Sequence, residues 1–343
     1  MTHSARLLTL LAAVVIATAD ASAQSRCRFL KVVEWPVRIA ANHLVVDGAI
    51  NGQAVGIMLD TGATLSAIER QTAEFLKLPL RDAPGRRIVG IGGQTQAALA
   101  VVDEFKLGEA TAQSLQLLVT GDGTRRMAWD VILGEDFLQR FDVEFDLAHD
   151  KVRLFRPQDC DGVSLAYWTK ENVAEVAIDA PREAQPRIEF TVKLNERTVE
   201  AMLDSGAAVS IVPLQDVAAL GITPESPGTT PAGVLGGMGA RQVPMWSAQF
   251  ASFAIGNESI PDIRIAFGDV WKDTAVKSLG SNVGKRLNAE PMIVGADFLR
   301  AHRMLVSHSQ RRLYFSYVGG PVFAVPTPRS PVKAPEPVKS SAP

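Results

Sequence analysis

The chain has 343 residues, enough for two domains of ordinary size, and its composition of 47% hydrophobic and 21% charged residues is that of a globular protein. The formal net charge of -2 argues against a nucleic-acid-binding protein, which needs a large basic surface to neutralise phosphates. The five histidines are scattered and no paired-cysteine spacing occurs, so we expect neither a metal site nor a cofactor.

The N-terminal segment, residues 1–23, is typical of a signal peptide. Arg6 precedes an apolar run from Leu7 to Ala19, and the small residues Ala21-Ser22-Ala23 form a cleavage signal before Gln24. The run is short for a helix that spans a bilayer, and an uncleaved membrane anchor is the alternative. We therefore expect an exported protein, periplasmic or secreted, with no stable membrane insertion after the signal is removed.

Both cysteines, Cys27 and Cys160, follow the expected cleavage site. In an oxidising compartment, two thiols of one chain are most simply a disulfide. Cys27 lies just before the first of two repeats described next, and Cys160 lies just after it, so a bridge would tie the beginning of that repeat to its end. Two buried free thiols are the alternative.

The chain contains an internal repeat. Residues 56–66 (GIMLDTGATLS) align with residues 200–210 (EAMLDSGAAVS) at a shift of 144 positions. The same shift places Gly92-Gly93 on Gly236-Gly237 without a gap. Two copies of one fold unit are therefore expected.

A third match joins residues 132–138 (ILGEDFL) to residues 293–299 (IVGADFL), now at a shift of 161. The second copy has therefore gained an insertion, which we place around residues 269–289 because that stretch is polar and rich in turn residues. Asp136 and Asp297 recur in this match, and we interpret them as structural residues at the start of a following helix.

Each copy predicts the same order of elements. A strand leads in, a turn follows, and an apolar strand then ends in Asp-Thr/Ser-Gly. A short helix is expected after this motif, another after the Ile-Leu/Val-Gly, and two strands close the copy. In the first copy we expect the first strand over 43–47, the turn at 51–52, the first helix over 66–76 and the closing strands over 143–146 and 152–155. In the second copy the corresponding ranges are 187–194, 195–196, 213–220, and 304–306 with 312–315.

These limits divide the chain into a first lobe over residues 24–156, a linker over 157–186 and a second lobe over 187–320. The linker is expected to hold a strand or two around residues 173–178. Residues 321–343 are rich in Pro, Ser and Lys and have little to bury, so we predict a disordered tail.

A single Asp-Thr-Gly is weak evidence for a catalytic site, because such a triplet also occurs in ordinary turns. Here the aspartate follows an apolar strand in both copies, at Asp60 and at Asp204. A carboxylate at the end of a buried strand is costly unless it is hydrogen-bonded or functional. Two turn aspartates in a duplicated β fold are the structural alternative, but a desolvated pair of like charges is a poor choice for structure alone.

Over residues 40–155 and 187–316 the sequence resembles the retropepsin-like and pepsin-like aspartic peptidases. This resemblance implies a mainly β fold, with two tandem retropepsin-like β-barrel lobes forming a pepsin-like bilobal acid-protease fold with a cleft between them. It also implies that Asp60 and Asp204 are the catalytic pair. The resemblance assigns the support of the two loops to Thr61, Gly62, Ser205, Gly206, Gly134 and Gly295.

The resemblance further places substrate-covering flaps at two glycine-rich stretches, although plain hairpin turns are the alternative. The flap positions are Gly90, Ile91, Gly92 and Gly93 in the first copy, and Leu235, Gly236, Gly237 and Met238 in the second. Neither stretch holds the tyrosine of pepsin flaps. Viral members have a second aspartate after the motif, where this chain has Thr64 and Ala208, so contacts at the ends of the cleft are expected to differ.

Two carboxylates a few ångströms apart share one proton, because they cannot both ionise cheaply. The pair is then suited to hydrolysing a peptide bond with an activated water molecule, by general acid-base catalysis. We therefore expect an aspartic endopeptidase that acts on a peptide or protein and works as a monomer, since one chain holds both aspartates. The alternative is a non-catalytic peptide-binding or partner-specific processing module on the same fold.

Overall fold

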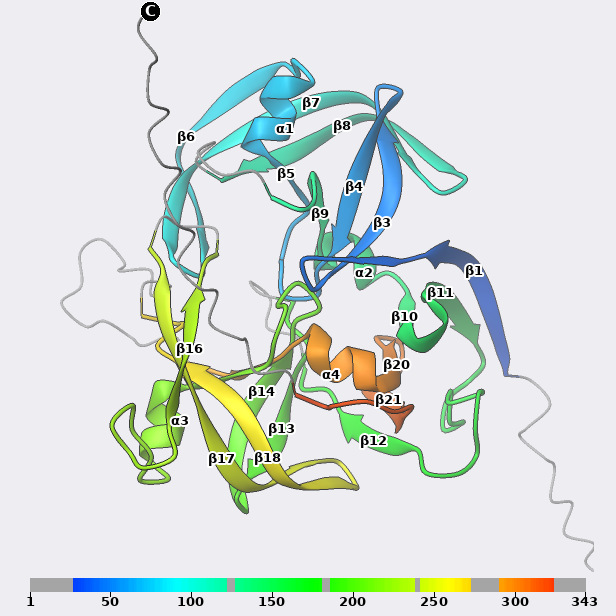
Figure 1. Cartoon of the computed structure of the whole chain (residues 1–343). Helices are drawn as coiled ribbons and strands as arrows, with labels where there is room; N and C mark the ends of the chain where they lie inside the picture. The colour runs from blue at the N-terminus through cyan, green and yellow to red at the C-terminus, as the bar shows by residue number, and fades with distance from the viewer. Residues whose placement is uncertain (1–26, 122–126, 181–185, 238–240, 273–289, 324–343) are drawn as a thin grey trace, which may run out of the picture.

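The computed structural model of the protein describes residues 27–121, 127–180, 186–237, 241–272 and 290–323. It is mainly β and consists of two repeated lobes and a third sheet that lies beside them (Figure 1). The mainly β, two-lobed fold that the sequence predicted is therefore confirmed. The predicted signal peptide, most of the predicted insertion and most of the predicted tail lie outside the described residues.

The first lobe is an eight-stranded sheet in which β3 also pairs with β7, so that the sheet closes on itself. Two short helices, α1 (Arg70–Phe75) and α2 (Glu135–Leu138), accompany it. The strand order is β2 (Arg38–Ala40), β3 (His43–Ile50), β4 (Gln53–Leu59), β9 (Val131–Leu133), β5 (Ala67–Glu69), β8 (Ala110–Thr120), β7 (Gly93–Leu107) and β6 (Leu80–Gly90).

The second lobe repeats this order without the counterpart of β2, and its closure joins β13 to β17. Its helices are α3 (Leu214–Ala218) and α4 (Ala296–Ala301). The strand order is β13 (Glu189–Leu194), β14 (Arg197–Leu203), β19 (Met292–Val294), β15 (Ile211–Pro213), β18 (Glu258–Gly268), β17 (Val243–Ile255) and β16 (Thr230–Leu235).

Alternation of side chains explains the lead-in strand of the second lobe. In β13 the side chains of Phe190, Val192 and Leu194 are buried, whereas Thr191 and Lys193 between them are exposed. This period of two places one face of the strand on the core, as the sequence predicted. The predicted turns also form, and Asn51 and Gly52 both have positive φ (48° and 77°), which suits the tight Asn-Gly hairpin between β3 and β4.

The first helix of each lobe is shorter than predicted. We expected a helix over residues 66–76, but Ala67–Glu69 forms strand β5, which pairs with both β8 and β9. In the second lobe Ile211–Pro213 forms the equivalent strand β15, and the helix that follows is shorter than the expected 213–220. Pairing with two neighbouring strands at once outweighs the local helical preference of these residues.

A six-stranded sheet joins the two halves of the chain. Its order is β1 (Arg28–Pro36), β11 (Lys151–Gln158), β10 (Asp142–Asp146), β20 (His302–Ser307), β21 (Arg312–Tyr317) and β12 (Ala174–Ala177). The predicted closing strands of both copies are present, with the 3-10 turn η2 (Leu147–His149) between β10 and β11. Their union into one sheet was not predicted: β10 pairs with β20, with Val143 opposite Val306.

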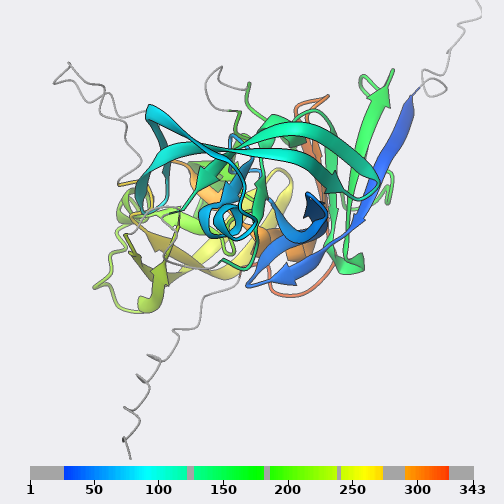
Figure 2. The ribbon, with the colours of Figure 1, turned by 90° about the horizontal axis from the view of Figure 1, so that it is seen from above.

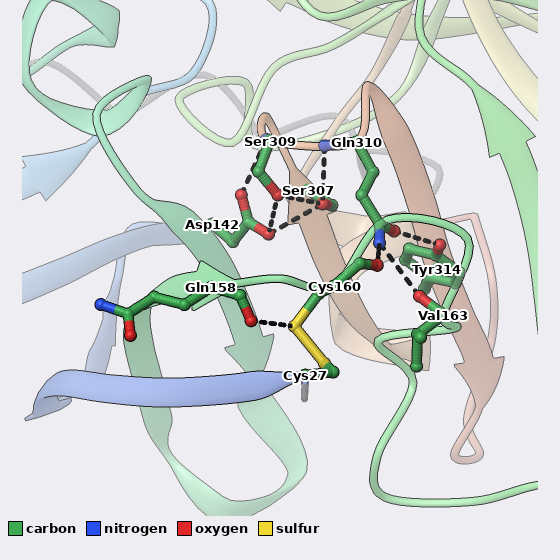
Figure 3. Close-up of a disulfide and its surroundings, with 9 residues drawn as sticks. All are labelled: Cys27, Asp142, Gln158, Cys160, Val163, Ser307, Ser309, Gln310 and Tyr314. Carbon is green, nitrogen blue, oxygen red and sulfur yellow. Dashed lines mark hydrogen bonds between the residues drawn. A yellow bond between two sulfur atoms is a disulfide. The ribbon is translucent and has the colours of Figure 1, made fainter. Parts of the chain in front are cut away.

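The linker strand and the disulfide tie down the edges of this sheet. Strand β12 lies within the predicted linker and pairs with β21. At the other edge β1 runs alongside β11, as Figure 2 shows, and a disulfide joins Cys27 to Cys160 just beyond them (Figure 3). The structure thus has the predicted bridge. Among the helices in the described ranges, none is long and apolar enough to cross a membrane.

Candidate active site

Asp60 and Asp204 occupy matching positions at the ends of two buried strands. Asp60 follows β4, and its amide donates a hydrogen bond to the Leu133 carbonyl of β9 (3.0 Å). Asp204 follows β14, and its amide donates to the Val294 carbonyl of β19 (2.9 Å). In each lobe a parallel strand pair therefore holds the aspartate at the point where the chain turns away from the sheet.

The two loops are locked together by a reciprocal set of buried hydrogen bonds. The Thr61 hydroxyl donates to the Leu203 carbonyl (3.0 Å) and accepts from the Ser205 amide (3.0 Å). The Ser205 hydroxyl donates to the Leu59 carbonyl (2.8 Å) and accepts from the Thr61 amide (3.0 Å). Thr61 and Ser205 are 1% and 0% exposed, so water does not compete for these bonds. The predicted support residues are thus brought together.

The loop glycines set how closely the two aspartates approach. A Cβ atom on Gly62 would overlap the carboxyl group of Asp204, and a Cβ atom on Gly206 would overlap that of Asp60. Each glycine therefore lies directly against the aspartate of the opposite lobe. Any side chain at these positions would push the carboxyl groups apart, which explains the need for glycine at both.

Backbone amides hold the two carboxyl groups in place. Oδ1 of Asp60 accepts hydrogen bonds from the amides of Gly62 (2.9 Å) and Ala63 (3.0 Å). Oδ1 of Asp204 accepts one from the amide of Ala207 (3.0 Å). The two carboxyl groups also act directly on each other, since the negative charge of Asp204 raises the pKa of Asp60. A proton on one of the two acids relieves this repulsion.

The electrostatics of the pair favour that proton. Burial, and then the negative charge of Asp204, raises the pKa of Asp60 well above its usual range. Burial also raises the pKa of Asp204, while its contacts with Asp60 and with the amides of Ala207 and Gly206 act in the opposite direction. Both shifts favour a pair that keeps one proton, and the titration belongs to the two carboxyl groups together.

The two lobes also share a serine and an aspartate that lie behind each loop. The Ser66 hydroxyl donates to Asp136 (2.7 Å), and the Ser210 hydroxyl donates to Asp297 (2.7 Å). The same hydroxyls accept from the amides of Gly134 (3.1 Å) and Gly295 (2.9 Å). Each serine thus ties its loop to the Ile-Leu/Val-Gly segment of the same lobe.

This arrangement adds two residues to the predicted site. Asp136 and Asp297 lie in the first turns of α2 and α4, as the sequence predicted, although neither helix has a side-chain cap. Their structural role is to accept hydrogen bonds from the two serine hydroxyls. Ser66 and Ser210 were missed, although their recurrence at the end of the aligned segments was the available signal.

The first predicted flap is the hairpin β6–β7, in which Gly90 pairs with Gly93 and the turn is Ile91-Gly92. Gly92 and Gly93 have φ of 84° and 130°, a backbone conformation that favours glycine. The Ile91 side chain packs against the hydrophobic cluster of the second lobe that contains Met202 and Val243. The first flap therefore reaches across to the opposite lobe.

The second predicted flap is the hairpin β16–β17, which points toward the first in Figure 1. Leu235 packs against the same cluster as Ile91, and a Cβ atom on Gly237 would overlap Ile91. Beyond the turn, the Arg241 amide donates to the Gly92 carbonyl (3.1 Å). Gly236 is exposed beside these contacts, and Met238 lies outside the described residues.

A further residue beside the second loop was missed. His43 at the start of β3 places Nδ1 2.8 Å from the carbonyl oxygen of Gly206, and its ring meets the edge of Trp129 at 4.3 Å. The repeat aligns His43 with Arg187, whose guanidinium lies 5.3 Å from the centre of the Trp271 ring. The alignment of the two copies could have drawn attention to His43. It also shows that the two lobes differ in charge at equivalent positions.

No metal-binding arrangement is present among the residues that the structure describes, since no group of three or more His, Cys, Asp or Glu side chains is placed to hold an ion. The two carboxyl groups are contacted by backbone amides and by glycines, and the buried hydroxyls of Thr61 and Ser205 brace the loops that carry them. This set can hold two carboxyl groups with one proton between them, the arrangement needed to activate a water molecule.

The chain is similar to known proteases in sequence. The family model described as aspartyl protease matches residues 46–137 and 190–298, which together are more than half of the chain and include both aspartates. Among solved structures, a retropepsin-like aspartic protease from Rickettsia conorii matches with 21% sequence identity and a TM-score of 0.29, over 38% of this chain and 94% of that one. A search of curated proteins found no match.

Proposed function

The chain belongs to the aspartyl protease family, and on this premise we propose that it is an endopeptidase in which Asp60 and Asp204 act as one catalytic pair. The observation that carries the proposal is the mutual contact of the two loops. Thr61 and Ser205 exchange hydrogen bonds, and each loop glycine lies against the opposite aspartate. Neither lobe alone contains this arrangement.

The proposed reaction uses the single proton of the pair. The protonated member of the pair donates a hydrogen bond to the carbonyl oxygen of the scissile peptide bond. The ionised member accepts a proton from a water molecule, whose oxygen attacks the carbonyl carbon. Collapse of the tetrahedral intermediate breaks the C–N bond as the nitrogen receives a proton, and the pair returns to its singly protonated state.

The substrate proposed for this site is an extended peptide segment held beneath the two hairpin flaps. Main-chain pairing with flap strands is a general way to bind an extended peptide without regard to its side chains. The lobes are not identical, since the place of His43 in one is taken by Arg187 in the other. The two sides of the scissile bond therefore meet different surroundings.

We propose that the active species is an exported monomer. Each lobe supplies one aspartate, so a complete site fits within one chain. The Cys27–Cys160 disulfide is typical of proteins that fold in an oxidising compartment. Together with the signal-like N-terminus, it favours the periplasm or the extracellular space.

Digestion of a proteome-derived peptide library at several pH values tests the function. Cleavage of many peptides by the wild type, and of none by Asp60→Asn, supports a general endopeptidase. Cleavage restricted to one partner protein supports the processing module. Peptide binding without any cleavage by a folded wild-type protein contradicts the proposed catalytic role.

A further inference from the structure

A buried carboxyl group that the proposed reaction does not use lies directly behind the Asp60 loop. Glu135 follows Gly134 and is 1% exposed. Its amide donates to the Ala63 carbonyl (2.8 Å), three residues after Asp60. Among the described residues, Oε1 of Glu135 has no hydrogen-bond partner. A buried carboxyl oxygen without a partner is costly and calls for an explanation.

A titratable group from the other half of the chain lies close to this carboxyl group. Nε2 of His308 lies 3.7 Å from Oε2 of Glu135. This nitrogen is also buried and has no hydrogen-bond partner in the part of the chain that the structure describes. The unsatisfied nitrogen thus lies beside the carboxyl group, with Oε2 as the oxygen at 3.7 Å and Oε1 as the oxygen without a partner. A small movement of the carboxyl group brings it within hydrogen-bond distance of the ring.

The position of His308 is held from both sides. It lies in the turn between β20 and β21, where the hydroxyl of Ser307 (2.8 Å) and the amide (2.9 Å) and hydroxyl (2.8 Å) of Ser309 all donate to Asp142 (Figure 3). His308 therefore projects from an anchored turn. A bond from Glu135 to this ring would fix α2, and with it the backbone behind Asp60, to the second half of the chain.

The internal repeat provides a comparison for this pair. Ala296 takes the place of Glu135 in the second lobe, and its amide donates to the Ala207 carbonyl at the same 2.8 Å. The shift of 161 that relates the closing strands places Leu147 opposite His308, and the turn η2 that contains Leu147 packs against α4. The backbone is thus repeated, whereas the polar pair is replaced by apolar residues. Packing alone does not require a glutamate here.

The electrostatics indicate that both members are neutral over a wide range. Burial, and then the negative charges of Asp60 and Asp136, raises the pKa of Glu135 to about 8. Burial lowers the pKa of His308 to about 4. The charged groups that act on Glu135 are therefore Asp60 on the loop and Asp136 on α2. Asp142 on β10 bonds to the serines on either side of His308. Buried beside two acids, Glu135 is expected to keep its proton.

We propose that Glu135 is a positioning residue for Asp60 that works as a neutral acid, donating its proton to Nε2 of His308 and so joining the backbone behind the Asp60 loop to the second half of the chain. The inference rests on the proposed peptidase function. It concerns one lobe only, because the second lobe has no equivalent donor. Loss of the bond misplaces Asp60 relative to Asp204, so kcat falls while KM changes little.

Four variants in the full-length protein test this inference with the best peptide from the library. Glu135→Gln keeps an N–H donor of the same shape, and we expect its kcat at mildly acidic pH to stay within about twofold of wild type. Glu135→Ala removes the donor and His308→Leu removes the acceptor. For each variant we expect kcat to fall at least about tenfold below the wild-type value. The double variant E135A/H308L copies the apolar residues of the other half, and we expect it to be as slow as Glu135→Ala.

Two kinetic outcomes would overturn the inference. Wild-type kcat in E135A/H308L would show that the pair only fills space, and a Glu135→Gln enzyme as slow as Glu135→Ala would show that a donor is not what matters. If Glu135→Ala does not fold, the comparison of Glu135→Gln with His308→Leu decides.

A second measurement does not depend on activity. The 15N resonances of the His308 ring are expected to show an unprotonated Nε2 that accepts a hydrogen bond in wild type and in Glu135→Gln. A protonated Nε2 in the wild type would overturn the inference even if no peptide is cleaved. Absence of wild-type cleavage, with the expected ring signature, would contradict the proposed function alone.

Discussion

Thr61 and Ser205 exchange hydrogen bonds across the interface of the two lobes. The hydroxyl and the amide of each residue bond to the loop that carries the other residue. The exchange fixes the distance between the aspartates that precede them. Since all four bonds are buried, the loops cannot separate without leaving polar groups unpaired. The candidate active site is therefore itself part of the interface between the lobes.

Removing the Thr61 hydroxyl is expected to destabilise the protein and slow cleavage. Thr61→Val keeps the shape but leaves the Leu203 carbonyl and the Ser205 amide without their partner. Each buried group left unpaired costs about 1–3 kcal/mol. Urea unfolding and peptide cleavage measure the two effects. Thr61→Ser retains the hydroxyl and serves as the control. Equal stability of wild type and Thr61→Val would contradict the role assigned to the hydroxyl.

Removing the disulfide is expected to lower the thermal stability without changing the site. The bridge joins residues 133 positions apart, and its loss from the chain is expected to cost about 2–5 kcal/mol. Thermal unfolding of the C27S/C160S variant, compared with the unreduced wild type, measures this. Intact-mass analysis with and without reductant checks the bridge itself, and two alkylatable thiols in the unreduced exported protein would refute it.

Acid is expected to weaken the edge of the six-stranded sheet through Glu34 of β1. Hydrogen bonds from Lys151, Arg153 and Lys31 lower the pKa of Glu34 to about 2, from about 4.5. Its contribution to stability is therefore present above about pH 4.5 and is lost as the pH falls toward 2. Unfolding measured against pH should show Glu34→Gln less stable than wild type at pH 6, with the two curves converging near pH 2. A constant difference down to pH 2 would contradict this account.

Much of the fold could be predicted because the chain repeats itself. Asp60 and Asp204, with the glycines that follow, were found from one alignment, and alternation in residues 187–194 predicted β13. The pairing of β10 with β20 was not predictable, because it joins strands far apart in sequence whose local patterns say only that each is a strand. The hydrogen bond between Ser66 and Asp136 was not predicted either, because it joins residues 70 positions apart.

Cleavage is expected to be fastest at acidic or mildly acidic pH. The active pair holds one proton, and burial together with the charge of Asp204 raises the pKa of Asp60. Activity is therefore retained above pH 4, where an ordinary aspartate has lost its proton, and it declines as the pH rises through the raised pKa. The pH dependence of kcat/KM measures this limit. A rate that continued to rise beyond about pH 9 would indicate a different nucleophile.

A monomer is expected to carry the complete site. Mixing inactive Asp60→Asn chains with inactive Asp204→Asn chains should restore no activity, because each chain has one defective aspartate in its own pair. Sedimentation of the mixture identifies the species present. Recovered activity would show that lobes of different chains combine.

The most direct test of the account is the turnover of Asp60→Asn and Asp204→Asn, each purified and compared with wild type on the same peptide. Asparagine keeps the shape of aspartate but cannot share the proton. The account predicts that both variants fold like the wild type, as judged by circular dichroism and urea unfolding, and that each loses all measurable cleavage. Substantial turnover by either single variant would contradict the assignment of Asp60 and Asp204 as one catalytic pair.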